Sequence, residues 1–132
     1  MTIRLKKSQS SMEFFTLIGL AFLAAAMIIA VSAKEMREFK DNSDFALIKD
    51  LGFKLQKEIG IAAYVEDGYK RTFTIPDKLE GALNYSIVTG NSSIAITTSK
   101  TSFSVRIPIT YGNFTKGTNI IERISDKIYV NK

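Results

Sequence analysis

The chain changes its pattern of apolar and polar positions twice along its length. Residues 14–33 carry no charged side chain and are almost wholly apolar. In residues 45–65 apolar side chains recur at steps of three and four, and after Gly68 apolar and β-branched residues alternate with polar ones. Steps of three and four are typical of an amphipathic helix, and strict alternation is typical of a half-buried strand. The pattern therefore predicts an α+β protein, with a long N-terminal helix over 9–67 and a small antiparallel β head over 68–132.

The uncharged run of residues 14–33 is long enough to cross a membrane. At about 1.5 Å per residue its helix measures about 30 Å, the thickness of a bilayer's hydrocarbon core. The first eight residues include Arg4, Lys6 and Lys7 and contain no acidic residue. Such a basic flank predicts a cytoplasmic N-terminus and an exported head. The alternative is a secretory signal cut after Ala30-Val31-Ser32-Ala33, although such signals usually have a shorter apolar core.

The second helical segment, residues 45–65, has one apolar face that must pack against something, and the sheet that follows is its natural partner. That face comprises Phe45, Ile48, Leu51 or Gly52, Leu55, Ile59, Ala62 and Ala63. The other faces carry Lys49, Asp50, Lys54, Lys57 and Glu58. Residues 41–44 are weak helix formers and predict a kink or a new N-cap between the segments. Gly68 is placed to end the helix as a left-handed C-cap.

The alternating part of the chain predicts short strands separated by turn residues. Strands are expected at 69–75, 83–89, 93–99, 103–107, 118–124 and 128–130, and turns at 90–91, 111–113, 116–117 and 125–127. Pro76 stops the first strand, and residues 77–81 read as a loop. Strands at this rhythm favour a small antiparallel sheet or a barrel-like head.

One acidic residue, Glu13, lies just before the apolar run. Its simplest interpretation is a helix start, with Ser10 as N-cap and Glu13 three residues later completing a capping box. A carboxylate there also suits the positive end of the helix dipole. The residues around Glu13 support a second interpretation.

The string Gln9-x-Ser11-x-Glu13-x-x-x-Leu17, preceded by Lys6-Lys7 and followed by an apolar helix, resembles the class III signal peptide of archaeal type IV pilins. The resemblance covers about a quarter of the chain. It implies a leader at residues 1–8, cut between Ser8 and Gln9 by a membrane-embedded prepilin peptidase. Ser8 stands where the family more often has Gly or Ala.

The resemblance further implies a surface filament made of identical subunits. Membrane-held precursors would be polymerised by a pilus assembly platform through their apolar helices, for adhesion or surface contact. It also implies that the new α-amino group of Gln9 pairs with the Glu13 carboxylate of another subunit. Small residues in the apolar run favour close helix packing, and Ala21/Ala25 and Ala26/Ala30 have the small-xxx-small spacing. The small residues singled out for packing are Gly19, Ala21, Ala25, Ala26 and Ala30.

The composition removes several classes of chemistry. There is no Cys and no His, which excludes thiolate and imidazole catalysis, disulfides, and the usual zinc and haem ligand sets. Ser and Thr have no His to activate them, and no nucleophile or phosphate-binding motif is present. Glu66-Asp67-Gly68 lacks the spaced oxygen ligands of a calcium loop. We therefore expect no enzyme, no cofactor, no metal site and no nucleic-acid partner, although the net charge is +5.

Three N-x-[ST] sequons lie in the head, at Asn84, Asn91 and Asn113, and make these side chains candidates for N-glycosylation. Asn91 and Asn113 fall in predicted turns and are the better candidates, whereas Asn84 lies in a predicted strand.

Three other functions stay open at this point. One is an uncleaved single-pass protein whose head is a monomeric binding module. Another is the neighbouring archaellum type of filament subunit. An enzyme would need an unrecognised acidic or Ser/Lys site.

Overall fold

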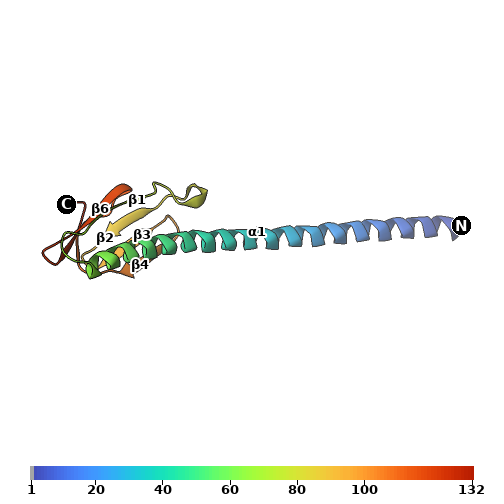
Figure 1. Cartoon of the computed structure of the whole chain (residues 1–132). Helices are drawn as coiled ribbons and strands as arrows, with labels where there is room; N and C mark the ends of the chain where they lie inside the picture. The colour runs from blue at the N-terminus through green and yellow to red at the C-terminus, as the bar shows by residue number, and fades with distance from the viewer. Residues whose placement is uncertain (1) are drawn as a thin grey trace. The chain divides into compact units, whose positions relative to one another are not determined.

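The computed structural model describes residues 2–132, with side chains described from Ser11 onward. It has one long helix followed by short strands, so the α+β class is confirmed (Figure 1). The elements are α1 (Thr2–Tyr64), β1 (Lys70–Ile75), the 3-10 turn η1 (Glu80–Ala82), β2 (Ser86–Thr89), β3 (Ser93–Thr97), β4 (Ser102–Arg106), β5 (Thr110–Gly112), β6 (Gly117–Ile124) and β7 (Lys127–Val130). The chain forms two compact units, residues 1–40 and residues 41–132, and we describe each by itself.

Helix α1 continues through residues 41–44, so the expected new N-cap is wrong. Four weak helix formers cost only a few tenths of a kcal/mol each, and strong helix formers flank them on both sides. Asp41 does not turn its carboxylate back to the backbone, because that group pairs with Lys100 Nζ at 2.6 Å. Tertiary contacts therefore override the local preference.

The strands form two sheets rather than one. The first has the order β1-β6-β7-β5 and the second the order β2-β3-β4. All neighbouring pairs are antiparallel except β5 and β7, which are parallel. The fully antiparallel head that the sequence predicts is therefore wrong for this one pair.

The prediction of a turn at residues 111–113 is also wrong, because Tyr111 and Gly112 belong to β5. Gly112 has a φ of +99°, and a Cβ there would collide with the carbonyl oxygen of Val130. The glycine allows β5 to approach β7 closely. Strand β2 is shorter than expected and begins at Ser86, while Leu83 forms an isolated bridge with Leu79.

Two connections have the left-handed backbone that their turns require. Gly68, with a φ of +94°, lies in the turn that leads from Glu66 to Tyr69, past the helix end at Tyr64. It is therefore a turn glycine and not the helix C-cap. The β6–β7 hairpin turns on two residues with positive φ, Ser125 at +50° and Asp126 at +63°, the pattern of a type I′ turn.

The core of the second unit lies where residues 45–64 of α1 meet the two sheets. Its fully or almost fully buried members include Ile48, Leu51, Leu55, Ile59 and Ala62 from α1, Ile75 and Ile121 from the first sheet, and Ile94, Ile96 and Val105 from the second. The expected amphipathic packing is therefore confirmed except at Phe45, a member of the predicted apolar face that is 39% exposed. Gly52 permits the closest approach, because a Cβ there would lie 2.7 Å from the Phe103 ring of β4.

Glu58 corrects the prediction that it lies on a solvated face. Its side chain is buried and its Oε2 lies 3.0 Å from Arg71 Nε on β1. An unpaired buried carboxylate would be costly, so the partner from β1 makes this burial tolerable. The pair also connects the helix with the first sheet.

Candidate functional site

The apolar run of residues 14–33 is uncovered by its own chain. Every described residue from Ser11 to Ser43 is exposed, including large side chains such as Phe22 at 73% and Leu20 at 68%. This part of α1 is long and apolar enough to cross a membrane. A helix that is apolar all round needs lipid or protein on every side. The segment is therefore the first candidate site for interaction.

The small residues of this segment lie on two separate faces. Ala21 and Ala25 line a shallow groove bordered by Ile18 and Phe22. At about 100° per residue, Ala26 and Ala30 lie about 140° around the helix axis from Ala21 and Ala25. Gly19 shares the face of Ala26 and Ala30, and apart from the nearby helix backbone no described atom lies within 4 Å of the place a Cβ would take there. Two neighbouring helices can therefore approach this one closely from different sides.

The residues of the expected processing motif lie partly before and partly after Ser11, where the described side chains begin. Lys6, Lys7, Ser8 and Gln9 lie outside the residues whose side chains are described. The expected cleavage bond and the amine partner of Glu13 are among them.

The other motif residues, Ser11, Glu13 and Leu17, lie on α1 and are exposed. Glu13 shares a shallow hollow with Met12, Thr16 and Leu17, and the Thr16 hydroxyl donates to the Met12 carbonyl at 2.8 Å. Helix α1 begins at Thr2, well before Ser10, so the capping-box interpretation of Glu13 is wrong. Its carboxylate instead lies on the side of a continuing helix, next to the apolar run.

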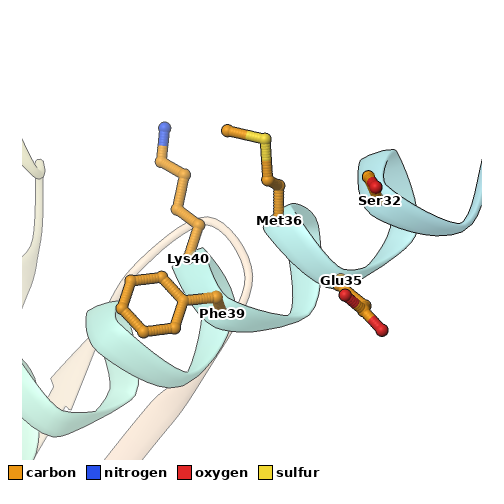
Figure 2. Close-up of a pocket in the computed structure, with 5 residues that line it drawn as sticks. All are labelled: Ser32, Glu35, Met36, Phe39 and Lys40. Atoms are coloured by element: carbon orange, nitrogen blue, oxygen red, sulfur yellow. The ribbon is translucent and has the colours of Figure 1, made fainter. Parts of the chain in front are cut away.

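The apolar surface of the first unit extends beyond the uncharged run. Met36 is 75% exposed and Phe39 is 77% exposed, and with Ser32, Glu35 and Lys40 they line a shallow hollow (Figure 2). Figure 2 shows Met36 and Lys40 extending to the same side of the helix and Glu35 to the other. Apolar and charged groups therefore alternate around this turn of α1. Such a surface suits contact with protein better than contact with lipid tails.

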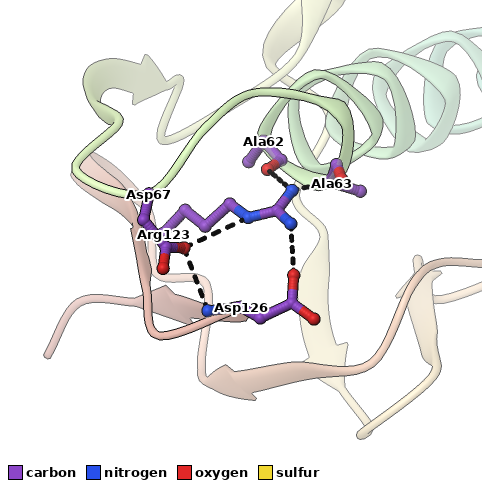
Figure 3. A network of polar contacts seen from close by, with 5 residues as sticks. All are labelled: Ala62, Ala63, Asp67, Arg123 and Asp126. Carbon is purple, nitrogen blue, oxygen red and sulfur yellow. Dashed lines mark hydrogen bonds and ion pairs between the residues drawn. The ribbon is translucent and has the colours of Figure 1, made fainter.

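In the second unit, Arg123 of β6 secures the C-terminal end of α1 (Figure 3). The last turn of α1 has no basic residue of its own. The Arg123 guanidinium donates to the Ala62 carbonyl at 3.3 Å and also to the Ala63 carbonyl. Cationic donors are favourable at a helix C-terminus, where carbonyls lack partners within the helix.

Two aspartates hold Arg123 in place. Asp126 pairs with the guanidinium, and Asp67 lies 3.5 Å from its Nε. Asp67 also accepts the backbone N–H of Asp126 at 2.9 Å, which fixes the hairpin turn against the chain that leaves α1. This network is structural, because its contacts join the end of α1, the hairpin turn and the chain between them; the buried Arg123 Nε makes no hydrogen bond and has only the ion pair with Asp67.

Asn119 organises the β5–β6 connection, a role that the sequence pattern does not reveal. Its fully buried side chain accepts from the Thr115 N–H at 2.9 Å and donates to the carbonyls of Thr115 and Gly117 at 2.6 Å and 2.9 Å. Asn131 donates to Asn119 Oδ1 at 2.8 Å. The one signal in the sequence is an asparagine at an inward position of an alternating strand.

Tyr85, in the loop before β2, has a raised pKa. Its hydroxyl donates to the Pro76 carbonyl, and Lys116 Nζ lies 4.5 Å from the ring centroid. Burial raises the pKa of Tyr85 above its ordinary value of 10.0, and the charge of Asp77 adds to the effect. The phenol is therefore held neutral as a hydrogen-bond donor.

All three sequon asparagines are exposed in the second unit. Asn91 lies in the β2–β3 turn, and Asn113 follows β5. Asn84 lies in the loop before β2, so its placement in a strand is wrong. The three side chains therefore remain equal candidates for N-glycosylation by exposure.

Among the residues from Ser11 onward, no group of three or more Asp and Glu side chains is placed to hold a metal ion. The features that remain are surfaces: the uncovered apolar helix and the exposed faces of the head. Comparison with protein-family models, with curated proteins and with solved structures finds no match to this chain.

Proposed function

We propose that the chain is the structural subunit of a type IV pilus-like surface filament. The precursor is held in the membrane by residues 14–33 and cut before Gln9. Its apolar helix then leaves the lipid to pack against copies of itself, and the head is displayed outside for adhesion or surface contact.

The observation that carries this proposal is the helix surface over residues 14–33, which is apolar all round and uncovered by its own chain. A plain anchor would need only lipid around it. The residues just before it resemble a pilin processing signal, and a cut there would leave the apolar helix attached to the head. The helix would then have a second environment besides lipid, namely the helices of other subunits.

The two faces of small residues favour a filament over a dimer. A two-fold dimer uses one self-complementary face of each helix. A filament is built by a heterologous contact that repeats without closing, so each helix needs two different faces. Ala21/Ala25 and Gly19/Ala26/Ala30 provide such faces, and both allow close approach of a neighbouring backbone.

Glu13 supports the same proposal. A carboxylate next to an apolar run is costly in a packed core unless it gains a partner. The free α-amino group that cleavage would create on Gln9 of a neighbouring subunit is a partner of opposite charge. The pair would form only between correctly staggered subunits, so Glu13 would set their axial register.

The test is the N-terminal sequence and intact mass of the protein in fibres sheared from native cells, compared with the membrane fraction of the same cells. We expect fibres whose subunits begin at Gln9. Subunits that begin at Met1 and occur only in membranes would identify an anchored binding module instead. A secreted form that begins at Lys34 would identify residues 1–33 as an ordinary secretory signal.

A further inference from the structure

The first sheet of the head presents a pair of tyrosines to solvent. Tyr111 on β5 and Tyr129 on β7 are direct partners in the parallel ladder. Their ring centroids lie 5.5 Å apart, with the ring planes inclined by 31°. Tyr111 is 43% exposed and Tyr129 is half-buried. The register of the ladder places the two tyrosines side by side on one face of the sheet, and their rings are in contact there before any partner arrives.

Two lysines border this tyrosine pair. Lys127 Nζ lies 5.7 Å from the Tyr111 centroid, and Lys132 Nζ lies 4.9 Å from the Tyr129 centroid. Both lysines are exposed. We call Tyr111, Tyr129, Lys127 and Lys132 the tyrosine–lysine patch.

The tyrosine–lysine patch carries a net positive charge. The nearest acidic residue in the ladder is Glu122, the β6 partner of Tyr129. Its carboxylate is already paired with Lys70 Nζ at 2.7 Å. Within the described part of the chain, neither Lys127 nor Lys132 forms an ion pair. The two ammonium groups are therefore available to an anion from outside.

We propose that the tyrosine–lysine patch binds an acidic polysaccharide, with sugar carboxylates on the two ammonium groups and the sugar C–H edges against the tyrosine rings. Tyrosine suits this contact because its ring is apolar and its hydroxyl forms hydrogen bonds. The ammonium–carboxylate bonds are charge-assisted and supply the selection for acidic sugars. The assignment of the ligand rests on the proposed function, because export places the head among extracellular polymers.

Single-stranded nucleic acid fits the patch less well. Its binding sites offer free aromatic faces on which successive bases stack. Here the two rings lie against each other, and each has an ammonium group close to its centroid. The apolar edge of a carboxylated sugar is smaller than the face of a base, and its carboxylate lies beside that edge. The sugar edge can therefore contact the edge of a tyrosine ring while its carboxylate contacts the neighbouring ammonium group.

The experiment measures binding of the detergent-solubilised full chain to immobilised polygalacturonate, with neutral dextran and oligothymidylate as comparison surfaces. We expect binding to polygalacturonate that weakens as salt is raised and no binding to dextran. Replacing both patch lysines, Lys127→Gln with Lys132→Gln, should weaken binding by about tenfold or more. The matched control is Lys116→Gln, which removes a lysine from another tyrosine ring and should change binding by less than about twofold.

A second pair of variants separates the rings from the charge. Tyr111→Ala should weaken binding by several-fold while the lysines stay, and Tyr111→Phe should retain most of it. Thermal unfolding of each variant identifies any loss that comes from a damaged head.

Four results would overturn the proposal. They are equal losses in Lys116→Gln and the patch variant, unchanged binding in a folded Tyr111→Ala, dextran binding as tight as polygalacturonate, and tighter binding of oligothymidylate. The proposed function fails separately. Polygalacturonate binding by a chain that never forms fibres would reject the filament and keep the patch, whereas fibres that do not bind would reject the patch alone.

Discussion

Residues 14–33 and residues 45–64 of α1 are both rich in apolar side chains, yet only the second segment is covered by its own chain. In the first segment every side chain is exposed. In the second, a stripe of apolar residues is buried beneath the two sheets while the opposite face stays in solvent. The difference follows from the pattern, because a stripe can be satisfied by one partner surface and an apolar surface all round cannot.

The comparison also shows which residues build the core of the head. Its core includes residues from α1 and from both sheets, so the second segment is part of the head's own structure. Among the described residues the first segment has no such partner, and a helix that is apolar all round needs lipid or protein around it. Variants that act on only one segment test this division.

The largest expected effect is on assembly, in Glu13→Gln. If Glu13 pairs with the amine of Gln9 in a neighbouring subunit, the neutral side chain leaves that amine without a partner in an apolar core, a cost of about 3–5 kcal/mol per contact. We expect normal export and processing but few fibres, measured as fibre yield by electron microscopy. The control is Asp50→Asn, an exposed carboxylate in the second unit. A normal fibre yield from Glu13→Gln would refute the pairing.

The next largest effect is on the stability of the head, in Leu55→Ala. Leu55 is 1% exposed, so its truncation should lower the free energy of unfolding by about 2–5 kcal/mol. The same change at Leu20, which is 68% exposed, should leave the head's stability unchanged. All five tyrosines lie at or after Tyr64 and there is no Trp, so tyrosine fluorescence during denaturation reports the head. A comparable loss in Leu20→Ala would show that the first segment supports the head after all.

Three consecutive alanines test the two faces of small residues. Ala25→Leu and Ala26→Leu each place a large side chain on a face that allows close helix approach, and overpacking costs about 1–3 kcal/mol. Ala24 lies on the remaining side of the helix with Leu20 and Met27, so Ala24→Leu is the matched control. We expect fewer fibres from the first two variants and near-normal yield from the third. Equal yields from all three would show that neither face is an interface.

Arg123 tests how the second segment is secured to the sheet. Arg123→Met removes the donors to the Ala62 and Ala63 carbonyls and should lower the free energy of unfolding by about 2 kcal/mol. Arg106→Met is the control, since the exposed Arg106 side chain should be replaceable within about 0.5 kcal/mol. Denaturant unfolding followed by tyrosine fluorescence measures both. A stability equal to that of the control would mean that the Arg123 network contributes nothing net.

The sequence predicts those parts of the fold whose signals are local. The apolar run, the amphipathic stripe, β1 before Pro76 and the β6–β7 hairpin all follow from periodicity and turn residues. Strand β5 is not predicted from the sequence, because it has three residues, contains Gly112, and pairs with a strand that is distant in sequence. A three-residue strand is too short to show a period.

The same limit applies to individual side chains. Glu58 reads as a solvated residue until β1 brings Arg71 to it. Asn119 reads as a strand residue until the β5–β6 connection closes around it. The tyrosine–lysine patch depends on the register of the parallel pair, which neither strand's sequence specifies. The candidate interaction site on residues 14–33 can be predicted residue by residue, because it lies on one continuous helix.

The smallest expected effect distinguishes the packed and open faces within the second segment of α1. Gly52 lies against the Phe103 ring, so Gly52→Ala forces the ring to shift and should destabilise the head by about 1 kcal/mol. At Gly60 no described atom beyond the nearby helix backbone lies within 4 Å of a new Cβ, so Gly60→Ala should stabilise the helix by about 0.5–1 kcal/mol. Opposite shifts of the denaturation midpoint are expected, again by tyrosine fluorescence. If Gly52→Ala stabilised the head as Gly60→Ala does, helix propensity and not close packing would explain the glycine, and the contact between α1 and β4 would be looser than its distances indicate.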